Sequence, residues 1–203
     1  MSYSDYNLVR LRHDFGLKVR DQVLFEPIGT LEPSSWFMES LKNGQDLAVS
    51  SEKARGEFIV APVLMACRVI LGHDLRIFSG VRLDVDPNRG LNGECDFLVA
   101  RSESSLVFQA PLMVLLEAKK SDFEVGLGQC AAQLLGARLY REKEGKAVAR
   151  VYGCGPTGYG RTVLAPAAGA RVGIGHRLQL LRQVRFRTMC CPHPPAGESD
   201  HAR

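Results

Sequence analysis

The chain has 203 residues, of which 45% are hydrophobic and 24% charged, and its net charge is +4. This length and composition fit one globular domain with a sizeable core, with or without an extension. No apolar run approaches the roughly 20 residues that a membrane span needs, so we expect no membrane association. The first residues, MSYSDYNLVR, contain no apolar stretch of the secretory kind, which favours a cytoplasmic location.

The positive charge is concentrated at the C-terminal end. Residues 151–203 contain seven arginines against only Glu198 and Asp200, whereas residues 1–150 hold nearly equal numbers of acidic and basic residues. The basic balance therefore describes the end of the chain, and it is weak evidence for nucleic-acid binding.

The six cysteines form no CxxC pair and suggest no structural zinc site. Without a secretion signal we expect them to be reduced thiols. A zinc site made of Cys190, Cys191, His193 and His201 is disfavoured by their spacing.

The first half of the chain predicts two helices. Ser34 or Ser35 is placed to cap a helix through SWFMESLKNG. The segment SEKARGEFIVAPVLMACRVIL predicts a longer helix with Ser51 as its N-cap and apolar residues on one face. Pro62 should kink or split this helix, and Gly72 should end it.

Strands and one more helix follow. LRIFSGVRLDVD predicts a bent strand or two short ones, CDFLVARS a second, and the apolar run APLMVLLEAKK a central strand buried on both faces. SDFEVGLGQCAAQLLGARLYREKEG predicts an amphipathic helix and KAVARVYGC a last strand. This order, αβββαβ, indicates an α/β fold with a mixed β-sheet flanked by helices.

The sequence changes character after Cys154. Residues 155–203 are rich in Gly, Pro, Ala and Arg and lack a clear period. We therefore expect a domain over residues 1–154 and an irregular basic tail over 155–203, which is disordered or out of frame.

One group of residues carries chemistry. Along a strand ending in VLLEAKK, Glu117 and Lys119 point the same way, and both charges need compensation there. Asp96, on the strand expected beside it, supplies a second carboxylate. Two converging carboxylates suit Mg²⁺ or Mn²⁺, and Lys119 would orient or deprotonate the attacking water in phosphodiester hydrolysis.

The pattern D-(x)n-E-x-K, on strands followed by a helix, resembles the PD-(D/E)XK (restriction-endonuclease-like) nuclease superfamily. Residues 14–154 resemble an uncharacterised bacterial branch with motifs like SEKARGEFIVAPVL, FSGVRLDVDPNRGLNGECDF, VLLEAKKSD and GLGQCAAQLLGARL. The resemblance implies a restriction-endonuclease-like core and a Mg²⁺-dependent endonuclease that acts on DNA, with RNA as an open alternative.

By this resemblance Asp96 and Glu117 are metal ligands and Lys119 is the catalytic lysine. Glu52 matches the acidic residue of the first helix, and Gln129 matches the polar residue that opens the helix after the lysine. Two departures matter: Cys95 stands where the superfamily name has Pro, and GPTGYGRTVLAPAAG replaces a threonine-rich turn, an aromatic strand and a last helix.

Several structural alternatives stay open. Glu117 and Lys119 would also fit a surface ion pair, Glu52 a favourable charge at a helix start, and Gln129 an ordinary polar position. Glu57 replaces Glu52 if the helix register differs, and Gln133 is expected on the surface. GLGQCA fits a dinucleotide fingerprint poorly because six residues separate it from its strand. Asp84 and Asp86 are expected to face solvent.

Two functional alternatives stay open as well. The chain would act as a catalytically inactive restriction-like fold that binds nucleic acid or a protein, or it would be an unstable fragment without function. The sequence marks no interface, so a homodimer also stays open.

Overall fold

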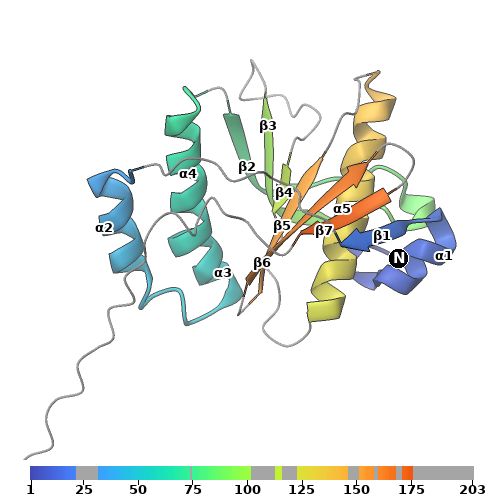
Figure 1. The fold of residues 1–203 in the computed structure, drawn as a ribbon, viewed down its shortest axis with the longest axis horizontal. Coiled ribbons are helices and arrows are strands. Elements are labelled where there is room, and N and C mark those ends of the chain that lie inside the picture. Colours follow the sequence, from blue (N-terminus) through green and yellow to red (C-terminus); the bar gives the residue numbers. More distant parts are fainter. Residues whose placement is uncertain are drawn as a thin grey trace, which may run out of the picture.

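The computed structural model describes residues 1–21, 32–73, 75–101, 113–115, 123–145, 151–157, 160–167 and 171–175. Its seven strands form one sheet in the order β1-β7-β6-β5-β4-β3-β2. Helices lie on both faces of this sheet, with α2, α3 and α4 on one side and α5 and α1 on the other (Figure 1). The expected mixed α/β fold is confirmed. Within the described ranges, no helix has the length and apolarity to cross a membrane.

The elements follow one another as a set of short helices, strands and one long helix. In chain order they are η1 (Tyr3–Asp5), α1 (Leu8–Phe15), β1 (Lys18–Asp21), α2 (Ser35–Gly44), α3 (Glu52–Arg55), η2 (Gly56–Val60), α4 (Ala61–Ile70), β2 (Leu75–Arg82), η3 (Pro87–Arg89), β3 (Glu94–Arg101), β4 (Met113–Leu115), α5 (Phe123–Lys143), β5 (Tyr152–Thr157), β6 (Gly160–Ala167) and β7 (Arg171–Gly175). β4 lies between β3, to which it is antiparallel, and β5, to which it is parallel. The expected position of this strand inside the sheet is thus confirmed over Met113–Leu115.

Pro62 is expected to kink or split the first long helix; the structure shows no gap but an interruption of the α-helical pattern just before Pro62. α3 and α4 are joined by a π-helical turn, η2, in which the Ala61 N–H donates to the Gly56 carbonyl five residues earlier. Pro62, in the first turn of α4, has no N–H to donate and its ring crowds the preceding turn, so the α pattern widens just before it. The end of the helix is marked by Gly72, whose φ is 69°.

Ser51 caps this helical segment through its hydroxyl, which accepts a hydrogen bond from the Ala54 N–H at 3.0 Å. We expect Ser51→Ala to lower the free energy of unfolding by about 1 kcal/mol, because one helix-end N–H loses its acceptor. Urea unfolding measures the loss, and Ser51→Asp, which keeps an acceptor, is the matched control. Equal stability of the two variants would contradict the role of the cap.

The described residues form two core clusters, one on each face of the sheet. The larger cluster joins the N-terminal segment and α5 to the residues around Leu83 and Leu91 and to Cys95 and Leu98 of β3. The smaller cluster joins Leu64 of α4 to Phe97 and Val99 of β3. β3 is therefore covered by helices on both faces.

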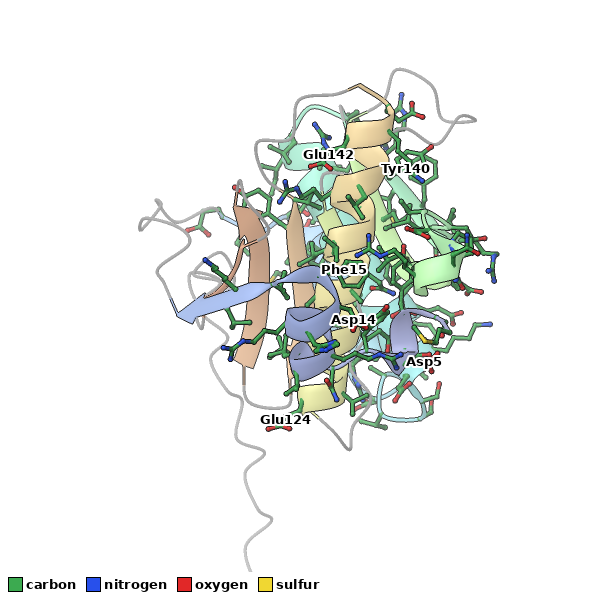
Figure 2. All side chains as sticks on the ribbon, turned by 90° about the vertical axis from the view of Figure 1, so that its right-hand side faces the viewer. Asp5, Asp14, Phe15, Glu124, Tyr140 and Glu142 are labelled. Carbon is green, nitrogen blue, oxygen red and sulfur yellow. The ribbon has the colours of Figure 1, made fainter. Side chains whose placement is uncertain are left out.

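α5 differs from the expected amphipathic helix. Every residue from Cys130 to Ala137 is buried. One side of α5 faces the sheet. The other side is covered by η1 and α1, which belong to the N-terminal segment of the chain. Figure 2 shows α1 in front of α5. Asp14 and Phe15 of α1 lie in front of the middle of α5, and Glu124 lies near one end of α5. A helix enclosed by a sheet and a second layer needs no polar face, which corrects the prediction.

The expected irregular tail is corrected in part. β5 runs across the expected boundary at residue 154, and β6 and β7 extend the sheet beyond it. β7 pairs in parallel with β1 from the N-terminal segment, with Val19 opposite Val172. Pairing with a strand so distant in sequence explains why local periodicity did not reveal these strands. Residues 176–203 lie outside the described residues.

Candidate functional site

Asp96 is half-buried in β3, at a place where the strand changes face. Successive side chains of a regular strand point to opposite faces, so Cys95 and Phe97 should share one face. Instead, Cys95 belongs to the α5-side cluster and Phe97 to the α4-side cluster. The alternation therefore breaks at Asp96.

The neighbouring strand shows the matching irregularity. The register of β2 and β3 pairs Ser79 with Phe97 and Val81 with Cys95, and it skips Gly80 and Asp96 between them. Gly80 has a φ of 64°, in the left-handed region that side chains other than glycine rarely adopt. The bend at Asp96 therefore involves both strands. It depends on Gly80, because any other residue would be strained in this backbone conformation.

Cys95 has a structural position beside this bend. Its side chain is fully buried, and burial raises the pKa of its thiol to about 12, with the charges of Asp96 and Glu94 adding to the effect. Burial therefore favours the protonated thiol, and the side chain packs as a small core residue. It fills the α5-side core.

Glu117 and Lys119 lie outside the described residues. The described part of β4 ends at Leu115, which pairs with Phe97. Glu117 and Lys119 therefore follow this strand in the sequence by two and four residues. Of the three residues at the centre of the expected site, the structure describes Asp96.

Glu52 and Glu57 have different surroundings. Glu52 is the first residue of α3, directly after the Ser51 cap, and is half-buried. Glu57 is exposed, and its carboxylate lies 4.0 Å from the Lys53 ammonium, one turn earlier. Glu57 is thus a surface residue with a weak ion pair, and Glu52 remains the stronger candidate of the two.

Gln129 and Gln133 lie one turn apart on α5 and so share a side of this helix. Gln129 is half-buried. Gln133, expected on the surface, is fully buried, and its Nε2 donates to the Glu94 carbonyl at 3.3 Å. The surface expectation is wrong because both sides of α5 are covered. The run CAAQLLGA, small and apolar around one glutamine, was the sequence signal of such a helix.

The expected metal ligands do not form a complete cluster within the described ranges. In that part of the chain, no three His, Cys, Asp or Glu side chains gather closely enough to hold a cation. Glu52, Glu57 and Asp96 therefore do not make such a group by themselves. α3, which carries Glu52, lies on the opposite side of the sheet from α5, which carries Gln129 (Figure 1).

Asp84 and Asp86 have other partners. The carboxylate of Asp84 accepts two hydrogen bonds from Arg82, each 3.0 Å long, and one from the Gly93 N–H. The Arg82 guanidinium holds the pKa of Asp84 below its usual value. Asp86 caps η3 by accepting from the Arg89 N–H. Asp84 is exposed, as expected, and both residues stabilise the turn before β3.

Compared with protein-family models, curated proteins and solved structures, the chain matches none of them.

Proposed function

We propose that the chain is a metal-dependent nuclease with a restriction-endonuclease-like core, which hydrolyses phosphodiester bonds in DNA and uses Mg²⁺ or Mn²⁺. The observation that carries the proposal is the position of Asp96. It lies at a bend of β3, one strand away from β4, whose sequence continues into Glu117 and Lys119. The element order α4, β2, β3, β4, α5, β5 also fits the αβββαβ order of such a core.

Strand geometry supports the grouping of the three residues. Phe97 packs with Leu64 on the α4 side of the sheet, and its partner in β4 is Leu115. If the alternation of β4 continues, Glu117 and Lys119 would share the face of Leu115, one and two strand periods further on. Because the strand alternation breaks at Asp96, its carboxylate would turn toward this α4 side of the sheet as well.

The donor chemistry suits a hard cation. Asp96 and Glu117 would hold it through carboxylate oxygens, the ligands that Mg²⁺ and Mn²⁺ prefer. When bound, the cation supplies Lewis acidity to the phosphate that is cleaved. Lys119 would donate hydrogen bonds to this phosphate and stabilise the negative charge that develops on it. Glu52, from the helices on the α4 side of the sheet, would orient the attacking water or the ligands, whereas Gln129, on α5 at the other face, would act only through the strands between them.

Replacing Lys119 with alanine tests the catalytic half of the proposal. We expect about 10²-fold slower cleavage of plasmid DNA in Mg²⁺, because one cationic contact to the transition state is lost. Lys120→Ala removes the neighbouring charge and is the matched control, which should cleave as the wild type does. Equal rates in the wild type and Lys119→Ala would remove the assignment.

Calorimetric titration with Mn²⁺ separates this function from that of an inactive binding module. A nuclease of this kind takes up Mn²⁺ through Asp96 and Glu117, whereas a fold that only binds nucleic acid or protein needs no such uptake. A wild-type protein that binds DNA, takes up no Mn²⁺ and cleaves nothing would favour the binding module.

A further inference from the structure

Gln133 places a side-chain amide in the core, where an apolar residue would cost less. The side chain is completely buried, and its Oε1 has no hydrogen-bond partner among the described residues. Burying an amide group without full compensation costs on the order of 1–3 kcal/mol. Leucine or methionine would fill the same space in α5 at no such cost. The presence of an amide here therefore calls for a reason other than packing.

Among the described residues, the hydrogen-bond partner of the Gln133 amide lies next to the bend in β3. Its Nε2 donates to the carbonyl of Glu94, the first residue of β3, two residues before Asp96. This hydrogen bond comes from a helix packed on the face of the sheet, and it fixes the orientation of the peptide between Glu94 and Cys95.

Asp96 is thus held from two sides. On its N-terminal side, the Glu94 carbonyl is anchored to Gln133 and the Cys95 side chain is buried against the α5 layer. On its C-terminal side, Phe97 is buried against α4 on the other face. These anchors require the backbone to turn at Asp96, opposite the left-handed Gly80. Loss of the Gln133 hydrogen bond would leave the Glu94 carbonyl without this anchor.

We propose that Gln133 is a positioning residue for the cation site, which it serves by holding the Glu94 carbonyl and thereby directing the Asp96 carboxylate. This inference rests on the proposed nuclease function. Removing a group that hydrogen-bonds to a metal ligand and orients it commonly lowers metal affinity by about 10- to 100-fold. The amide is retained in the core for the orientation of Asp96 and not for the stability of α5.

The test compares Gln133→Leu and Gln133→Met with the wild type in two measurements. We expect Mn²⁺ affinity, measured by calorimetry, to fall about 10- to 100-fold, while the urea midpoint of unfolding stays the same or rises. A purely structural role predicts the reverse, with lower stability and unchanged Mn²⁺ affinity. Leu134→Met is the matched control, because Leu134 is an equally buried neighbour on α5. It should leave Mn²⁺ affinity unchanged.

The outcomes separate this inference from the proposed function. A wild-type protein that takes up no Mn²⁺ ends both. A wild-type protein that takes up Mn²⁺ with the same affinity as both Gln133 variants ends the positioning role alone. If neither variant folds, NMR of the wild type decides: in a Mg²⁺ titration, the Gln133 side-chain amide and the Glu94 carbonyl should shift with the midpoint of Asp96. Unmoved Gln133 and Glu94 signals at saturation would overturn the inference.

Discussion

Asp96→Asn is expected to lower the rate of Mg²⁺-dependent DNA cleavage by about 10³-fold, the order of loss when a main electrostatic contact to the transition state is removed. Asparagine keeps the size of the side chain and one oxygen but carries no charge. A divalent cation loses one of its two proposed anionic ligands, so Mn²⁺ uptake should also fall below detection in calorimetry. Plasmid cleavage and Mn²⁺ titration of the same preparation measure the two effects together.

The control for this variant is Asp84→Asn. Asp84 is another carboxylate near β3, but its oxygens are already engaged by Arg82 and the Gly93 N–H. Its side chain is 41% exposed, so the loss of this ion pair should cost little stability. We expect wild-type cleavage and Mn²⁺ uptake. If Asp84→Asn and Asp96→Asn lost activity equally, Asp96 would have no special role.

The features that the sequence predicted correctly have local signals. Ser34 accepts from the Phe37 N–H and Ser51 from the Ala54 N–H, as N-cap residues do. The break at Pro62 follows from its missing N–H alone. The apolar run before Glu117 predicted a strand inside the sheet, and β4 has neighbours on both sides. Each of these signals lies within a few residues of the feature that it specifies.

The features that the sequence missed depend on contacts between distant parts of the chain. The buried Gln133 donates to the Glu94 carbonyl, 39 residues away in the chain, a contact that nothing in the helix itself encodes. The pairing of β7 with β1 joins segments about 150 residues apart in the chain. In both cases the information lies in packing across the fold and not in a local period.

For the candidate site, the sequence predicts a composition but not a geometry. The pattern of Asp96, Glu117 and Lys119 names residue types and strands, but strict alternation from Leu98 would put Asp96 on the α5 face. The alternation breaks between Cys95 and Phe97, opposite Gly80, so strict alternation does not assign a face to Asp96. A glycine inside a strand is a recognised sign of such an irregularity, so Gly80 was the available signal in the sequence.

The close contact between Gly136 of α5 and the Tyr3 ring predicts a stability change of unusual sign. Gly→Ala inside a helix ordinarily stabilises it by about 1 kcal/mol. Here a Cβ on Gly136 would meet the hydroxyl of Tyr3, with its Cζ at 2.9 Å and Cε1 at 3.0 Å. Tyr3 is 1% exposed, and its hydroxyl donates to the Leu83 carbonyl at 2.8 Å, so the ring cannot move freely.

We therefore expect Gly136→Ala to lower the free energy of unfolding by about 3 kcal/mol, the sum of overpacking and a weakened buried hydrogen bond. Urea unfolding measures it. Tyr3→Phe removes the hydroxyl, so the double variant should lose less stability than the two single variants together. Stabilisation by Gly136→Ala would mean that η1 does not cover α5. A helix with one side exposed to solvent should be amphipathic, as the sequence alone predicted for α5.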